Sequence, residues 1–213
     1  MKKLTLSIIL LACTCLITWA QTSGNTPLDG VVKKLDQAKT VADYQSLEKT
    51  FVQIGNAAKT DWLPYYYAAF CNAKTGFLLQ DDGEKIEPFS VKGEAQIKKS
   101  ESLADKADKK ALAEIYVVQS MIYRTKVFIN PMTMGREFGT LSDQFLKKAQ
   151  ALDPENPRGM YVQAWTKFYT PKLWGGDKGL AKELAGKVSQ QLSNVVFSTA
   201  PHWGKAESDA LLK

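Results

Sequence analysis

The sequence predicts an all-α protein, and three observations support this fold class. The 213 residues are 45% apolar and 23% charged, the composition of a globular protein long enough for one sizeable core. Apolar residues recur at spacings of three and four, as at Leu47, Phe51 and Ile54, which marks one buried face of a helix. No segment shows the alternation of a half-buried strand. Because no long Gly-, Ser- or Pro-rich tract divides the chain, we expect a single domain over residues 21–213.

The first twenty residues have the pattern of a secretory signal peptide. Lys2 and Lys3 precede an apolar run that ends in small residues at Ala20. We predict cleavage after Ala20 and export, so that the protein is periplasmic or secreted. The run is short for a membrane-spanning helix, which needs about 20 apolar residues. An alternative is an outer-membrane lipoprotein, since "LLAC" resembles a lipoprotein cleavage box with Cys13 as the acylated residue.

Removal of the signal peptide changes the charge and the cysteine count. Loss of Lys2 and Lys3 leaves 26 of the 28 basic residues against 22 acidic ones, so the net charge falls from +6 to +4. This small net charge is spread along the chain. Because nucleic-acid binding needs a concentrated basic face, we expect no nucleic-acid partner. Cys71 is then the one cysteine left, which excludes an intramolecular disulfide. We expect it to be a small buried residue.

The first half of the predicted domain reads as four helices, at residues 28–38, 41–57, 62–80 and 94–107. Asp61 is expected to cap the third, and Pro64 fits its first turn. Residues 81–93 are expected to be a loop, and their acidic residues lack the spacing of a calcium-binding loop. The lysine-rich fourth helix has few apolar residues and is expected to lie partly in solvent.

The second half continues with the most apolar segment after the signal peptide. Ala111–Asn130 is predicted to be a central core helix, because Gln119, Arg124 and its length argue against a membrane span. The Asn130-Pro131 step ends it, and residues 132–139 are expected to be an inserted connection. Helices at 140–152, 158–170, 177–193 and 205–213 bring the expected count to about nine.

Two glycines in "YTPKLWGGDKGLAKEL" raise the question of a phosphate-binding loop. Such a loop follows a strand and has a lysine at a fixed spacing after its glycines. Here a helix precedes Gly175 and Gly176, and the lysine spacing does not match. We therefore interpret the glycines as a turn between two helices, with Asp177 as the cap of the next one.

Small and aromatic residues recur in a pattern that resembles tetratricopeptide repeats. One unit has Tyr116, Ser120 and Tyr123 in its first helix and Ser142, Leu146 and Ala149 in its second, and Asp153-Pro154 closes it. A second unit has Met160 and Ala164, then Ala181, Leu184 and Ala185, and an earlier, weaker unit has Tyr65, Ala69 and Ala95. In the family, the small residue allows two helices to approach closely, so we expect Ala164 at a tight helix crossing.

The resemblance implies antiparallel helix pairs stacked as a short, irregular tetratricopeptide-like superhelix. The units start at Tyr65, Tyr116 and Met160, which are 51 and 44 residues apart, whereas the family repeats about every 34 residues. The expected loops at 81–93 and 129–139 account for most of the excess. The chain is also similar to small secreted bacterial repeat proteins, and this similarity implies no biochemical role.

The resemblance further implies a binding module, in which the first helix of each unit lines a concave face that holds a protein or peptide. The positions that match this face are aromatic, methionine and arginine residues: Tyr66, Phe70, Met121, Arg124, Arg158, Tyr161, Trp165 and Phe168. The alternative is that these residues only pack the core. For Arg124 and Arg158, the alternative is an ion pair with a nearby acid such as Glu114 or Glu155.

An enzyme is the second hypothesis, and the sequence offers little for it. The chain has one histidine, His202, and no His, Cys or Asp cluster with metal-ligand spacing. No nucleophile lies in a recognised elbow. We therefore expect no catalysis, metal or cofactor. The alternative is a small hydrolase or acid–base enzyme whose site is assembled only by the fold.

Overall fold

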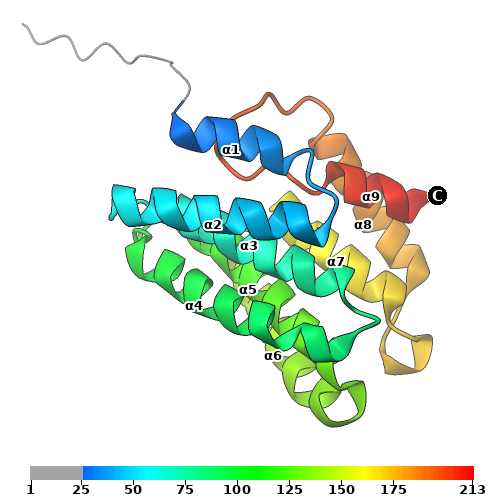
Figure 1. Cartoon of the computed structure of the whole chain (residues 1–213). Coiled ribbons are helices and arrows are strands. Elements are labelled where there is room, and N and C mark those ends of the chain that lie inside the picture. Colours follow the sequence, from blue (N-terminus) through cyan, green and yellow to red (C-terminus); the bar gives the residue numbers. More distant parts are fainter. Residues whose placement is uncertain (1–25) are drawn as a thin grey trace, which may run out of the picture.

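The computed structural model describes residues 26–213, which form an assembly of packed helices joined mostly by short connections (Figure 1). This part contains no strand, so the all-α prediction is confirmed. The predicted signal peptide, its cleavage site and Cys13 lie outside the described residues. The helices are α1 (Pro27–Leu35), α2 (Val41–Ala58), α3 (Leu63–Leu78), the 3-10 helix η1 (Gly83–Lys85), α4 (Glu87–Leu103), α5 (Lys109–Ile129), α6 (Pro131–Leu152), α7 (Pro157–Tyr169), the 3-10 helix η2 (Lys172–Trp174), α8 (Lys178–Gln191) and α9 (Lys205–Leu212).

Side chains at several helix starts satisfy backbone N–H groups that have no partner within the helix. Thr26 and Thr40 each form a capping box with the aspartate three residues later. Asp177 accepts a hydrogen bond from the backbone of α8 at 3.0 Å, as predicted. Asp61 accepts one from the first backbone N–H of α3 at 2.9 Å, although Trp62 occupies the N-cap position.

The predicted start of the fourth helix is wrong. α4 begins at Glu87, seven residues before the expected start at Glu94, and the segment 81–93 is mostly helical. Pro88 does not prevent this, because the first turn of a helix does not need the N–H that proline lacks. The helix lies partly in solvent, as expected, with Ile97 fully buried on its inner face.

The predicted connection at 132–139 is also wrong, because α6 runs without a break from Pro131 to Leu152. Asn130 ends α5 and caps α6, with its side chain accepting a hydrogen bond from the backbone N–H of Thr133 at 3.2 Å. The added turns pack along α5, where the rings of Tyr123 and Phe138 stack with centroids 6.3 Å apart.

The helices are arranged as a row with further helices packed beside it. α3, α5, α7 and α9 form the row, in which each contacts the next. α4 packs against α3 and α5, α6 against α5 and α7, and α8 against α7 and α9. Successive helices therefore pair and stack in chain order (Figure 1).

Two clusters of buried side chains hold these layers together. The larger joins α1–α5 with α6 and α7 and includes Phe51, Tyr67, Ile97 and Ile115. The smaller lies between α7, α8 and α9, with Ala164 fully buried among residues that include Leu184, Val188 and Leu211. Cys71 is buried and free, as expected, and burial raises the pKa of its thiol.

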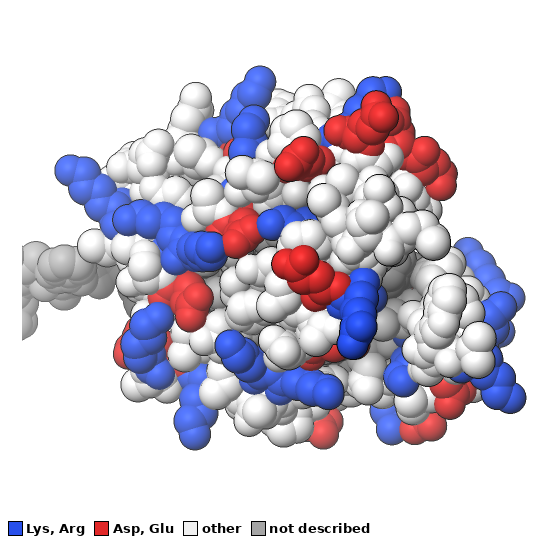
Figure 2. Space-filling model, turned by 90° about the horizontal axis from the view of Figure 1, so that it is seen from below, with Lys and Arg blue, Asp and Glu red and all other residues white. Residues whose placement is uncertain are grey.

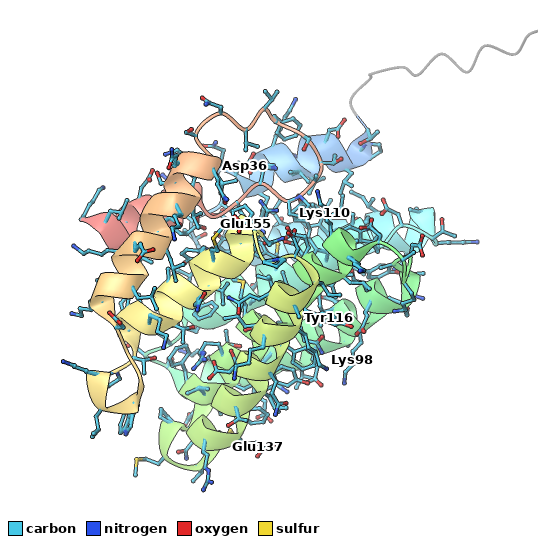
Figure 3. The ribbon with its side chains drawn as sticks, turned by 180° about the vertical axis from the view of Figure 1, so that it is seen from behind. Asp36, Lys98, Lys110, Tyr116, Glu137 and Glu155 are labelled. Carbon is cyan, nitrogen blue, oxygen red and sulfur yellow. The ribbon has the colours of Figure 1, made fainter. Side chains whose placement is uncertain are left out.

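The chain between α8 and α9 returns across the molecule to α1 and α3. The Tyr67 hydroxyl donates to the carbonyl oxygen of Thr199 at 2.8 Å. The His202 Nε2 atom lies 3.0 Å from a carboxylate oxygen of Asp36, which follows α1 and lies beside this segment in Figure 3. Trp203 is thereby held over the row of helices, where its indole N–H donates to the Tyr66 hydroxyl at 2.8 Å.

The two glycines form a turn between α7 and α8, as predicted. Gly175 has a φ of +89°, which favours glycine over residues with a side chain. A Cβ at Gly176 would overlap the carbonyl oxygen of Thr170. The backbone N–H of Asp177 donates to the carbonyl oxygen of Lys167 at 2.9 Å, which closes the turn.

The surface carries both signs of charge. On the face viewed from below, lysine and arginine side chains alternate with aspartate and glutamate (Figure 2). Within residues 26–213, no helix is both long enough and apolar enough to span a membrane.

Candidate ligand-binding groove

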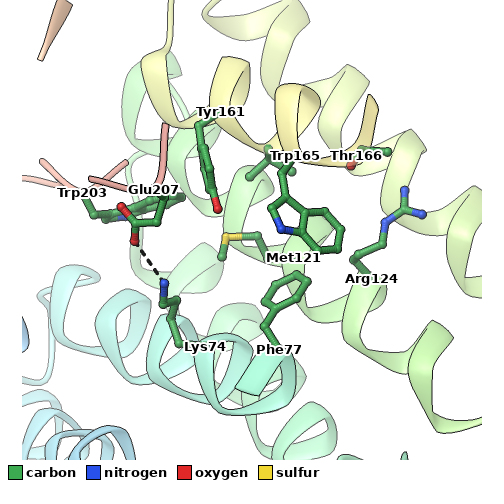
Figure 4. Close-up of a pocket in the computed structure, with 10 residues that line it drawn as sticks. Lys74, Phe77, Met121, Arg124, Tyr161, Trp165, Thr166, Trp203 and Glu207 are labelled. Atoms are coloured by element: carbon green, nitrogen blue, oxygen red, sulfur yellow. Dashed lines mark hydrogen bonds and ion pairs between the residues drawn. The ribbon is translucent and has the colours of Figure 1, made fainter. Parts of the chain in front are cut away.

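A hollow lined by aromatic side chains opens between the row of helices and the C-terminal segment. This aromatic hollow has a volume of about 130 Å³ and lies between α3, α5, α7 and residues 203–207 (Figure 4). α3 contributes Phe77, α5 contributes Met121, and α7 contributes Tyr161 and Trp165. Trp203 closes the hollow from the C-terminal side. These faces suit a flat, apolar ligand.

The aromatic rings pack against one another along the hollow. The centroids of Phe77 and Trp165 are 5.0 Å apart, and those of Tyr161 and Trp203 are 6.1 Å apart, each pair edge to face. The Phe70 ring packs against Trp203 in a tilted arrangement, with centroids 4.7 Å apart. The walls of the hollow are therefore fixed by contacts among themselves.

Charged side chains stand at the two ends of the aromatic hollow (Figure 4). At one end Lys74 and Glu207 form an ion pair at 3.0 Å. At the other end a terminal guanidinium nitrogen of Arg124 lies 2.7 Å from a carboxylate oxygen of Asp143. Burial lowers the pKa of Arg124, while the charge and hydrogen bond of Asp143 act in the opposite direction.

Two further hollows adjoin the first and share residues with it. The C-terminal hollow, of about 600 Å³, shares Lys74, Trp203 and Glu207. The polar hollow, of about 350 Å³, lies between α5, α6, α7 and the α7–α8 turn and shares Arg124 and Thr166. We call the three hollows together the groove.

A buried network around Glu114 supports the wall formed by Trp203. The Tyr66 hydroxyl donates to one carboxylate oxygen of Glu114 at 3.2 Å and accepts the hydrogen bond from Trp203. Asn156 and the Nε atom of Arg158 donate to the other oxygen, at 2.6 and 2.9 Å. Burial acts to lower the pKa of Arg158, but Glu114 outweighs it, so that this pKa is raised.

The predicted binding residues fall into three groups. Met121, Arg124, Tyr161 and Trp165 line the aromatic hollow, and Phe70 lines the C-terminal hollow. Tyr66 is fully buried, and Arg158 is paired with Glu114, which is the alternative that the sequence left open. Phe168 packs against the cluster between α7, α8 and α9.

Of the residues that line the aromatic hollow, the sequence analysis missed six: Lys74, Phe77, Val162, Thr166, Trp203 and Glu207. Phe77 lies seven residues, or about two helical turns, after Phe70 on the same face of α3, so a wider search of that face would have included it. Trp203 and Glu207 were read as a turn and the start of a short helix. Their approach to α3 depends on the return of the chain across the fold.

No metal centre is evident among the described residues, where no three His, Cys, Asp or Glu side chains are grouped suitably for one. His202, which the sequence singled out as the one histidine, is placed outside the aromatic hollow beside Asp36.

Comparison with solved structures finds a match to the HusA haemophore from Porphyromonas gingivalis. The two chains are 28% identical, with a TM-score of 0.73, and the match covers 87% of this chain and 89% of the haemophore. No protein-family model matches the chain, and a search of curated proteins finds no match either. The chain is thus similar to an all-helical binding protein over most of both lengths, while the tetratricopeptide assignment stays a prediction.

Proposed function

We propose that this chain is an exported haem-binding protein that carries its ligand in the groove between α3, α5, α7 and the C-terminal segment. The observation that carries the proposal is an aromatic-lined hollow on the inner row of helices, in a chain similar to a haemophore over 87% of its length. Its class, a binding protein without catalysis, is the one that the sequence predicted. The ligand differs, since the sequence favoured a protein or peptide.

The chemistry of the groove suits a haem ring. The ring is flat and apolar, and its transfer from water to apolar surroundings is favourable by about 25 cal/mol per Å² of buried surface. Phe77, Trp165 and Trp203 offer aromatic faces and edges, and Met121 offers an adaptable thioether. The aromatic hollow alone is smaller than the range of about 300–1,000 Å³ that small-molecule sites occupy, and the adjoining hollows of about 600 and 350 Å³ bring the groove to just above that range.

Met121 and Tyr161 are the side chains in the aromatic hollow with atoms of the kind that ligate haem iron. Burial strongly raises the pKa of the Tyr161 phenol, which disfavours the phenolate form that binds iron. The groove therefore supports binding through the ring more strongly than binding through the metal.

An absorbance titration of the purified protein with haem tests the proposal. We expect a saturable shift of the haem absorption band at one haem per chain. Trp165→Ala should weaken binding about tenfold or more, because it removes a stacking face. The matched control is Tyr116→Ala, a half-buried aromatic residue near α4 on the side seen in Figure 3.

The proposal would fail if the absorbance change did not saturate at a fixed ratio of haem to protein. It would also fail if Trp165→Ala, like the control Tyr116→Ala, bound haem as tightly as the unmodified chain. Export and cleavage after Ala20 are part of the same proposal. Mass spectrometry of the N-terminus in the envelope or culture medium tests them, and an acylated Cys13 would favour the lipoprotein alternative.

A further inference from the structure

We propose that the polar hollow is a carboxylate subsite, which receives the acidic side chains of a ring bound in the aromatic hollow. The inference rests on the proposed function and makes it more specific. It predicts that the protein selects rings carrying free carboxylates and binds them in one direction along the groove.

The polar hollow adjoins the aromatic hollow, and the two share Arg124 and Thr166 in their linings. We infer that a ligand on Trp165 reaches the polar hollow past these two side chains. In Figure 4 the Arg124 guanidinium lies at the end of the aromatic hollow opposite the Lys74–Glu207 pair. Trp174, which is 75% exposed, forms an outer wall of the polar hollow.

The polar hollow has an excess of positive charge. Arg124, Lys147 and Lys167 line it, against one carboxylate, that of Asp143. Neutral hydrogen-bonding side chains also line it: Gln150, Gln163, Thr166 and Thr170. Cations and neutral donors around one hollow fit an anionic oxygen group.

Arg124 in particular is incompletely satisfied. Its side chain is only 15% exposed, and one terminal nitrogen binds Asp143. Its Nε atom is buried and has no hydrogen-bond partner. A buried donor without a partner is costly, and a carboxylate that approaches a guanidinium can accept two hydrogen bonds from it.

The opposite end of the aromatic hollow has a smaller excess of positive charge, because Lys39, Lys74 and Lys205 line the C-terminal hollow there against Asp36 and Glu207. There the Nζ atom of Lys74 already contacts Glu207 at 3.0 Å, and a ligand carboxylate would have to displace that glutamate. The carboxylates of a bound ring are therefore directed toward α6, and the apolar part of the ring lies between Met121 and Trp165.

The test compares haem with its dimethyl ester, in which both carboxylates are blocked. Absorbance titrations of the unmodified protein should show haem bound about tenfold more tightly than the ester. That ratio corresponds to about 1.4 kcal/mol, near the contribution of a hydrogen bond to a charged group. Raising the salt concentration should weaken binding of haem and leave binding of the ester unchanged.

Two variants assign the effect to the polar hollow. Lys147→Gln should weaken haem binding about threefold to tenfold and leave ester binding unchanged, because Lys147 lines the polar hollow alone. Arg124→Gln, at a residue that lines both hollows, should weaken haem binding about threefold to tenfold more than ester binding. The matched control is Lys148→Gln, which removes the same charge from the next residue of α6, where the ammonium lies over the Phe145 ring. Thermal unfolding of each variant verifies that the fold is intact.

The possible results are distinct. Equal binding of haem and ester by the unmodified protein would overturn the carboxylate subsite and leave the proposed function standing. A loss of haem and ester binding to the same extent in Arg124→Gln and Lys147→Gln would also overturn it, because it would indicate a general role in packing. Failure of both ligands to bind would overturn the proposed function itself.

Discussion

Arg124 and Arg158 look alike in the sequence, yet they lie in different electrostatic surroundings. Both side chains are largely buried, with 15% and 13% exposed. Arg158 is paired with Glu114, and Asn156 and Tyr66 share the same carboxylate. Arg124 has one exposed partner, Asp143, and keeps a buried nitrogen without one.

The difference separates a structural arginine from a candidate binding arginine. In the Glu114 network most charges and donors are matched within the fold, so an added ligand would gain little there. At Arg124 the protein leaves hydrogen-bonding capacity unused beside a hollow, and a ligand can use it. The variants below test this distinction in order of expected effect.

Glu114→Gln should cause the largest loss of stability, about 3–5 kcal/mol. It removes the charge that compensates Arg158 in a buried site, and an uncompensated buried charge is strongly destabilising. Urea unfolding measures the effect. The double variant Glu114→Gln/Arg158→Gln should recover part of the loss, because it leaves no charge unpaired.

A loss below about 1 kcal/mol in Glu114→Gln would contradict the comparison, since this is the magnitude typical of an exposed pair. Trp203 provides a second readout, because it is linked to Glu114 through Tyr66. Its fluorescence should change in Glu114→Gln even where the chain remains folded.

Ala164→Leu should destabilise the fold by about 1–3 kcal/mol. α7 carries Arg158 toward the Glu114 network and Trp165 toward the groove, and Ala164 is fully buried on the same helix. A larger side chain there forces neighbours away from their preferred packing. An unchanged unfolding midpoint in urea would mean that α7 tolerates this displacement and that its register is not fixed by Ala164.

Much of the fold could be predicted from the sequence, because its local signals agree with the tertiary structure. Periodicity gave the helical class, and Asp177 and the two glycines gave the turn before α8. The errors lie at the starts of α4 and α6. Residues 81–93 and 132–139 are expected to be connections, whereas α4 begins at Glu87 and α6 at Pro131, with Pro88 and Pro131 in their first turns.

The groove could be predicted only in part. Alignment with the tetratricopeptide repeat identifies the helix faces that carry four of its residues: Met121, Arg124, Tyr161 and Trp165. The contribution of Trp203 and Glu207 depends on a long-range return of the chain to α3, which leaves no periodic signal. Whether an arginine has hydrogen-bond partners for all its nitrogens also depends on residues distant in sequence. The partner of Arg158, for example, is Glu114, 44 positions away.

Glu94 pairs with one largely buried lysine, Lys126, and one exposed lysine, Lys98, and the pH dependence of stability tests the strength of these pairs. Burial acts to raise the pKa of its carboxyl group, but hydrogen bonds from Lys126 and Lys98 outweigh this and lower the pKa from 4.5 to about 2. Its stabilising contribution is therefore complete above about pH 4.5 and is lost as the pH falls toward 2.

We expect the contribution of Glu94 to be about 1 kcal/mol, because solvent screens its partly exposed partners. Urea unfolding between pH 5 and 2 should show a smaller decrease in stability for Glu94→Gln than for the unmodified chain. The matched control is Glu183→Gln, which removes an exposed i,i+4 pair with Lys187 on α8. Parallel pH profiles for Glu94→Gln and the unmodified chain would contradict the prediction.

Asp143→Asn should have the smallest effect on stability and the most informative effect on binding. Asp143 is more than half exposed, so loss of its ion pair with Arg124 should cost less than about 1 kcal/mol. The same change removes the one carboxylate that lines the polar hollow. If Arg124 is reserved for a ligand, haem should bind about twofold to threefold more tightly to Asp143→Asn, and haem dimethyl ester should bind as before. Weaker haem binding would mean instead that Asp143 holds Arg124 in place for the ligand. Arg124 would then resemble Arg158, as a side chain whose position depends on its acidic partner.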